Sequence, residues 1–260
     1  MNEWSQKRRR IILSIIFGVL IFVIGLPLFF FLYRSPTCSD GKQNGDEVGI
    51  DCGGGCEMLC QADNLPIVSK GDPQVVRVGS TTYAVALSAE NPNINSDILR
   101  AGYLFKIFDA SSTVPVMIVD GETYIPKNGR FVVFGGPYDF VEAVPARATF
   151  EWKKESLVWN TNSKEVPDLI IENKFISEEA SEPKITAELY NPTLDAVVNV
   201  ELTVVVSDIS GNTIGVSKTF VESIDKNERV PIVYTWPQSF DGVPAQIDVF
   251  IKILPDKSFL

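Results

Sequence analysis

The sequence predicts a mainly β protein with one transmembrane helix, a small disulfide-rich module and two tandem antiparallel β-sandwich domains. Residues 11–33, IILSIIFGVLIFVIGLPLFFFLY, form a run of 23 residues without a charge. All four cysteines fall within residues 38–60. The rest of the chain consists of short β-rich runs separated by turn residues, and it resembles itself at an offset of about 100 positions.

The uncharged run at residues 11–33 is long enough to cross a bilayer as a helix. At about 1.5 Å per residue its length is roughly 34 Å, slightly more than a hydrocarbon core of about 30 Å. Backbone groups inside lipid must form hydrogen bonds within their own segment, so a single span has to be helical. We therefore expect a transmembrane helix over these residues.

Charges on either side of this run predict its orientation. Four cations, Lys7 to Arg10, precede it, and one cation, Arg34, follows it. By the positive-inside rule, residues 1–10 form a cytoplasmic tail and the C-terminal domains are extracytoplasmic. One alternative is a cleaved signal peptide, whose apolar region is usually only about 7–15 residues long. Another is lipid attachment at Cys38, but the preceding SPT is no obvious lipobox.

The segment beyond Arg34 is strongly acidic. It holds 18 Lys and Arg residues against 32 Asp and Glu residues, a net charge of 18 − 32 = −14. Nucleic-acid binding requires clustered cations, so a nucleic-acid partner is not expected. The acidic charge also disfavours contact with an anionic membrane surface and fits a soluble exported region.

The cysteine spacing predicts disulfides. Outside the cytosol, an even number of cysteines in a short polar stretch indicates a stapled module, which we place at residues 34–62. The spacing is C-x13-C-x3-C-x3-C, whereas zinc sites usually contain C-x2-C pairs, and the chain has no histidine. Four cysteines allow three pairings, and the sequence does not choose among them. The predicted disulfide residues are Cys38, Cys52, Cys56 and Cys60.

The same segment contains oxygen ligands at spacings that suggest calcium. With Asp40 as position 1 of a twelve-residue loop, Gly45 occupies position 6, where an EF-hand loop turns sharply. Lys42 at position 3 and Val48 at position 9 oppose binding, and Asp, Asn and Gly are also ordinary turn residues. We therefore expect no cofactor, with calcium as the alternative. The candidate ligands are Asp40, Asn44, Asp46 and Asp51.

The pattern C-x-D-G-x-x-N-G-D-E-x-G-x-D-C-G-G-x-C in residues 38–56 resembles a known module. Short cysteine-rich modules of this kind occur in predicted surface and secreted proteins of microbes, often beside β-sandwich repeats. The resemblance implies a cell-surface or envelope setting and says little about activity.

The remainder of the chain lines up with itself in one register. Asn91-Pro92 matches Asn191-Pro192, and Asp109 matches Asp208. The sequence therefore predicts a first β-sandwich, a linker and a second β-sandwich, each sandwich of about 90 residues. The matching stretches are 83–93 with 184–193, 104–114 with 202–215, and 144–152 with 243–251. The predicted boundaries are 63–155, 156–165 and 166–260.

The motifs ALSAENPN…KIFD and AELYNPT…VVVSDISGNTIG resemble the FxLYD and LEA14-like β-sandwich families, which are related to immunoglobulin and fibronectin type III folds. The resemblance implies two domains of one fold. The first copy lacks a glycine after Asp109, so its hairpin turn should differ from that of the second copy. The apolar residues expected inside the sandwiches are Val85, Leu87, Phe105, Ile107, Leu189, Val204 and Val206.

Nothing in the sequence indicates catalysis. Without histidine the usual general base is missing, and neither a dinucleotide-binding nor a P-loop motif is present. Trp152, Trp159 and Trp236 could form a ligand platform, but core packing is the commoner role, with Trp159 expected at the junction between the domains. We expect a non-catalytic, membrane-anchored, outward-facing structural or protein-interaction protein of the cell envelope, with a protein partner. The alternatives are a calcium-binding adhesion or sensor module and, less favoured, an envelope enzyme.

Overall fold

The structure is a computed structural model, and it describes residues 3–28, 36–177 and 182–255. The chain divides into two compact units, Met1–Cys56 and Glu57–Leu260, and each is considered by itself. The first unit contains the N-terminal helix and most of the cysteine-rich segment. The second contains all of the described strands.

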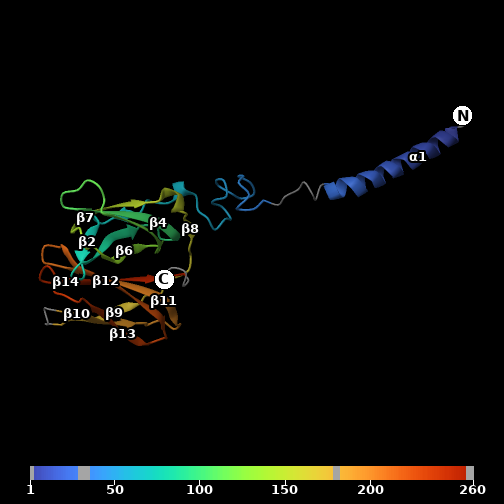
Figure 1. Cartoon of the computed structure of the whole chain (residues 1–260). Helices are drawn as coiled ribbons and strands as arrows, with labels where there is room; N and C mark the ends of the chain where they lie inside the picture. Colours follow the sequence, from blue (N-terminus) through green and yellow to red (C-terminus); the bar gives the residue numbers. More distant parts are fainter. Residues whose placement is uncertain (1–2, 29–35, 178–181, 256–260) are drawn as a thin grey trace. The chain divides into compact units, whose positions relative to one another are not determined.

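An N-terminal helix, α1, spans Glu3–Leu20 and continues through a π-helical turn at Ile21–Gly25 and on to Leu28 (Figure 1). Within it, Gln6–Leu28 contains an 18-residue window with a mean hydropathy of 2.9, so by length and composition this helix is able to cross a membrane. The predicted helix is confirmed up to Leu28. Its last five positions, 29–33, lie outside the described residues.

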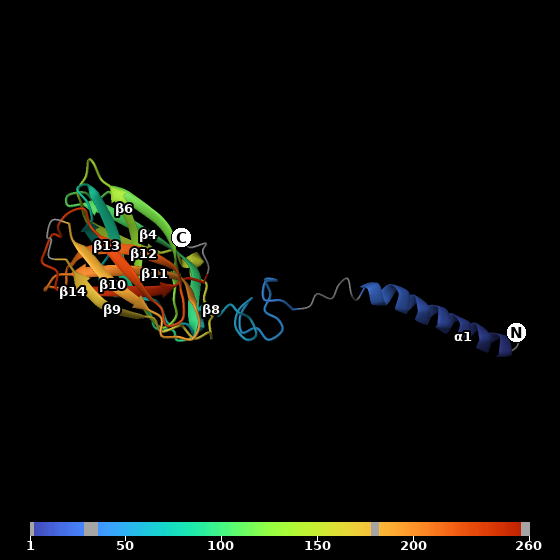
Figure 2. The same cartoon turned by 90° about the horizontal axis from the view of Figure 1, so that it is seen from below.

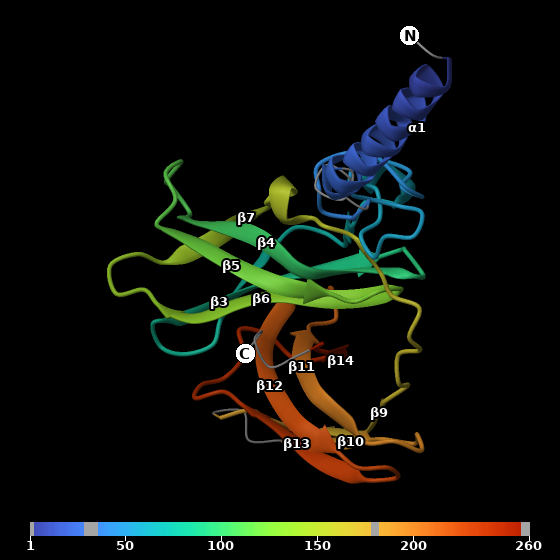
Figure 3. The ribbon, with the colours of Figure 1, turned by 90° about the vertical axis from the view of Figure 1, so that its right-hand side faces the viewer.

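Two antiparallel sheets form the first β-sandwich (Figure 3). In one sheet the central strand β4 lies between β5 and β7, and the short β8 also pairs with β4. In the other, β3 is central, with β6 along one edge and β1 and β2 along the other. The strands are β1 Val68–Ser69, β2 Gln74–Arg77, β3 Thr82–Asn91, β4 Ser96–Asp109, β5 Met117–Ile125, β6 Gly129–Asp139, β7 Pro145–Trp152 and β8 Asn160–Thr161.

The second sandwich has the same strand order. Its sheet β12-β11-β14 corresponds to β5-β4-β7, and its sheet β13-β10-β9 corresponds to β6-β3-β2. Both sandwiches therefore share one antiparallel pairing of strands in the same chain order. The strands are β9 Ile170–Ile176, β10 Lys184–Tyr190, β11 Val197–Ser207, β12 Thr213–Ile224, β13 Arg229–Thr235 and β14 Gln246–Ile253.

Each sandwich has its own apolar core. Because successive side chains of a strand point to opposite faces, every second residue of β3, β4, β10 and β11 enters the space between two sheets. All seven residues predicted to be buried are at most 2% exposed, so this prediction is confirmed: Val85, Leu87, Phe105, Ile107, Leu189, Val204 and Val206.

Asn91 and Asn191 occupy matching positions at the ends of β3 and β10, and both are fully buried. The Asn91 side-chain NH2 donates to the backbone carbonyls of Ser96 and Pro126, at 2.9 Å each. The Asn191 NH2 likewise donates to the carbonyls of Asp195, Ile224 and Asp225. Each asparagine thereby ties the turn after its own strand to the turn before β6 or β13, where backbone donors and acceptors would otherwise be unpaired.

The two sandwiches also pack against each other, so that four sheets are stacked as layers (Figures 1 and 2). Side chains of β3 point alternately to the two faces of its sheet. Val85 therefore enters the first core, and Ala84 lies on the opposite face. That face contacts Val205 and Val216 of the second sandwich in a third apolar cluster. The inner sheets are covered on both faces, which explains why every residue of β11 from Asn199 to Val206 is buried.

The tryptophans pack inside the sandwiches. Trp159 is buried and Trp152 is partly buried in the first core, while Trp236 is buried in the second, 4.9 Å from the Phe240 ring. The expected position of Trp159 at the junction is therefore wrong: the short strand β8, within the predicted linker 156–165, pairs with β4 and holds the preceding Trp159 in the first core. The domain boundaries themselves stay predictions.

Candidate functional site

The cysteine-rich segment is closed by disulfides. Cys38 bonds to Cys56, with 5.7 Å between their Cα atoms, and Cys52 and Cys60 are disulfide-bonded as well. No described cysteine is free. The disulfide-rich module of the predicted fold class is thus present, and the structure selects one of the three pairings that the sequence left open.

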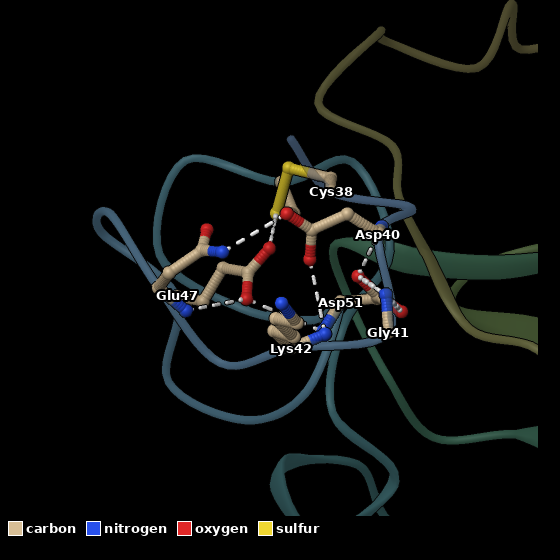
Figure 4. The surroundings of a disulfide bond; sticks show 8 residues. Cys38, Asp40, Gly41, Lys42, Glu47 and Asp51 are labelled. Carbon is tan, nitrogen blue, oxygen red and sulfur yellow. Dashed lines mark hydrogen bonds between the residues drawn. A yellow bond between two sulfur atoms is a disulfide. The ribbon is translucent and has the colours of Figure 1, made fainter. Parts of the chain in front are cut away.

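Carboxylates organise the loop that this disulfide closes (Figure 4). The Asp51 carboxylate accepts hydrogen bonds from the backbone N–H groups of Asp40 and Gly41, at 2.9 Å each. The Asp40 carboxylate accepts from the Asn44 side chain and the Lys42 N–H, at 3.0 Å each. The bond from Asn44 lowers the pKa of Asp40 most, because it favours the charged form. The two carboxylates thereby accept hydrogen bonds from backbone N–H groups of this loop, as a neighbouring strand would do in a sheet.

Glu47 and Gly54 complete the loop. The Glu47 carboxylate accepts from the Asn44 N–H at 3.1 Å. Gly54 has φ +61°, and a Cβ there would lie 1.6 Å from the backbone oxygen of Asp46. Only glycine fits that approach, so the CGGGC stretch has a steric function in this turn.

The candidate calcium ligands are only partly brought together. Asp40 and Asn44 are hydrogen-bonded side chain to side chain, and Asp51 reaches the backbone of Asp40. Within the described residues, just one trio of His, Cys, Asp or Glu ligand atoms lies within 4.8 Å, namely Cys38, Glu47 and Cys56. Asp40, Asp46 and Asp51 do not form such a trio, and two members of the trio that exists share a disulfide. Calcium binding stays a prediction.

A second polar cluster lies between the two sandwiches. Lys252 of β14 and Glu201 of β11 are directly opposite each other, with Nζ 3.0 Å from Oε1, and their side chains are 6% and 9% exposed. Lys218 of β12 lies 3.1 Å from the other oxygen of Glu201. The Lys252 ammonium also donates to Thr123 Oγ1 at 3.0 Å and to the Val132 carbonyl at 3.4 Å, both in the first sandwich.

Burial and the neighbouring charges shift the pKa values of this cluster in opposite directions. Burial lowers the pKa of Lys252, because it disfavours the ammonium more than Glu201 favours it. Burial alone would raise the pKa of Glu201, but the ammonium groups of Lys252 and Lys218 together hold it below its usual value. The sequence analysis did not single out these residues. The sequence signal that could have identified them is a charged residue inside an apolar strand, namely Glu201 in VNVELTVVV and Lys252 in VFIKIL.

A groove of about 630 Å³ opens within the second unit, where the two sandwiches and the segment between them meet. Asp97 lies in its wall and is only 3% exposed. Its Oδ2 accepts hydrogen bonds from the Tyr124 hydroxyl at 2.9 Å and from Asn162 Nδ2 at 2.6 Å. Desolvation raises the pKa of Tyr124, so the phenol stays protonated and donates. Sequence reasoning did not find this groove, because its walls come from distant segments.

Neither a scan against protein-family models nor a search of curated proteins finds a match to this chain. The resemblance to the FxLYD and LEA14-like families, and that of the cysteine-rich module, therefore stay predictions.

Proposed function

We propose that this protein is a single-pass membrane protein of the cell envelope whose exported region is a non-catalytic structural or protein-interaction element. The observation that carries this proposal is the order of the segments along the chain. An apolar helix able to cross a membrane is followed by a disulfide-closed module and then by a four-layered β unit. Disulfides persist in oxidising compartments, which supports an extracytoplasmic position for everything beyond the helix. The cations at Lys7 to Arg10 support a cytoplasmic N-terminus.

The two sandwiches are proposed to be copies of one repeat. Their equal strand orders support this, as do the matching hydrogen bonds of Asn91 and Asn191. Two copies that pack through an apolar face with a buried ion pair form a stiff body. Such a body is suited to presenting a binding surface outside the membrane.

Topology is tested with the full chain carrying an epitope tag at each end. Proteinase K added to intact cells or spheroplasts should remove the C-terminal tag and spare the N-terminal tag, and lysed cells should lose both. Protection of the C-terminal tag in intact cells would refute the proposed orientation. Crosslinking of intact cells with an amine-reactive reagent should then give a higher-mass adduct, which a reporter fused to residues 1–36 does not form.

Calcium binding is the second candidate, supported by the grouping of Asp40, Asn44 and Asp51 in one loop. Isothermal titration of the full chain in lipid nanodiscs with CaCl2 tests it. A binding heat that disappears in Asp40→Asn would establish the site. Equal traces for the wild type and this variant would exclude it.

A further inference from the structure

We propose that the groove beside Asp97 binds an extended peptide segment of a protein partner, with a lysine or arginine side chain placed at Asp97 and apolar side chains on either side of it. This inference rests on the proposed interaction function and specifies its site and the chemistry of its partner.

The Asp97 carboxylate has one oxygen that is available to a ligand. Both of its hydrogen bonds go to Oδ2, and within the described part of the chain none goes to Oδ1. Oδ1 is also not among the described polar atoms that are both fully buried and unpartnered, so it keeps some accessible surface, and Asp97 lines the groove. A carboxylate buried this far gains substantially from a cationic partner, because few water molecules reach it.

The wall that carries Asp97 is held in place before any ligand binds. The Asn162 N–H donates to the Asn95 carbonyl and the Thr161 N–H donates to the Glu57 carbonyl, at 2.8 Å each. The Lys127 ammonium donates to the carbonyls of Asn162 and Lys164. These two hydrogen bonds hold the backbone of residues 162–164 in place. A site fixed in this way loses little entropy when a ligand is bound.

The lining of the groove is both acidic and apolar. Four acidic residues and one cation line the groove, a net charge of 1 − 4 = −3. Apolar side chains of both sandwiches and of the connecting segment form most of the remaining surface. The charged lining residues are Glu57, Asp97, Glu165, Asp168 and Lys164, and the apolar ones include Leu99, Val166, Leu169, Ile251, Ile253 and Leu254.

The size of the groove favours a peptide as its ligand. A volume of about 630 Å³ lies within the range of about 300–1,000 Å³ that is usual for ligand sites, and such sites often occur between domains. The volume suits a few residues in extended conformation. An acidic, apolar groove selects a cationic, apolar segment by charge complementarity.

The test is selection of a phage-displayed random heptapeptide library on the full-length chain in lipid nanodiscs, after removal of binders to empty nanodiscs. Selected peptides should contain lysine or arginine beside apolar residues. Their affinity for Asp97→Asn should fall at least tenfold, because this nearly isosteric change keeps an oxygen for Tyr124 and Asn162 but replaces the free oxygen with an N–H donor. The matched control, Asp120→Asn, removes an equal charge from an exposed position outside the groove and should not alter affinity.

A second variant, Glu165→Lys with Asp168→Lys, reverses two exposed rim charges without touching a core and should also weaken binding. The proposal is overturned if no peptide is enriched, if the enriched peptides lack cations, or if the groove variants bind them as well as the wild type. It is equally overturned if peptides bind only after deletion of residues 256–260, since the groove would then belong to that segment. Failure here leaves the membrane topology experiment unaffected, so the two proposals are judged separately.

Discussion

Lys252 Nζ lies 3.0 Å from Glu201 Oε1, and both groups are buried where the two sandwiches meet. The same ammonium reaches Thr123 and Val132 of the first sandwich, so one ion pair of the second sandwich also fixes the position of the first. Apolar packing tolerates sliding, whereas a buried charge is satisfied in few arrangements. This pair therefore defines how the sandwiches are oriented.

Removing the negative partner should be costly. Glu201→Gln leaves the Lys252 ammonium buried without an anion, and we expect a loss of about 3–5 kcal/mol in the free energy of unfolding. Denaturant unfolding of the full chain in nanodiscs, followed by tryptophan fluorescence, measures this. Glu151→Gln, in the exposed pair with Lys106, is the matched control and should cost no more than about 1 kcal/mol.

The double variant Glu201→Met with Lys252→Met should be close to wild type in stability, since replacing a buried pair with apolar residues is often neutral or stabilising. Peptide amide hydrogen exchange across β11 and β14 would show whether the sandwiches still pack in the same arrangement. A double variant that loses as much stability as Glu201→Gln would contradict this account of the pair.

Acid should weaken the same interface. The pKa of Glu201 is lowered in the folded state, so its contribution is fully present above its unfolded pKa of about 4.3 and is lost as the pH falls through the folded pKa. The pKa of Lys252 is also lowered, so the cost of burying its ammonium is present at low pH and is relieved as the pH rises from the folded pKa to the unfolded one. The melting temperature of the wild type should therefore fall below that of the double Met variant as the pH falls below about 4. A constant difference between pH 7 and pH 3 would show that Glu201 does not contribute.

Asn91→Ala and Asn191→Ala should each destabilise the protein. Each change leaves buried backbone carbonyls without a donor, at a cost of about 1–3 kcal/mol for a group left unsatisfied. Similar losses at the two positions would also support the proposed repeat. Asn95→Ala is the control, since this neighbouring side chain is exposed, and it should change stability by less than about 0.5 kcal/mol. A neutral Asn191→Ala would show that the turn is satisfied by other donors.

Disulfide mapping should recover one peptide that links Cys38 to Cys56 from the unreduced protein. Reduction should make residues 38–56 sensitive to protease while the strands stay resistant, because a short polar segment cannot supply its own core. The variant Cys38→Ser with Cys56→Ser should be cleaved in this segment without reductant. Four thiols alkylated in the native protein would exclude the disulfides.

The sequence alone determined the parts of this protein that depend on local pattern. An unbroken apolar run has only one way to satisfy its backbone in lipid, so the helix up to Leu28 could be predicted. Alternation within single strands identified buried residues such as Val85 and Val204, because side-chain direction follows from the strand period.

Tertiary structure decided what depends on contacts between distant segments. Three disulfide pairings were equally compatible with the cysteine count, and the loop geometry selected Cys38 with Cys56. Strand alternation does not reveal whether a second face meets water or another sheet, so neither the four-layer stack nor the partner of Lys252 was foreseeable. The place of Asp97 in a groove depends on Asn162 of the connecting segment and on Ile251 and Leu254, which are all far from it along the chain, so local pattern could not reveal it.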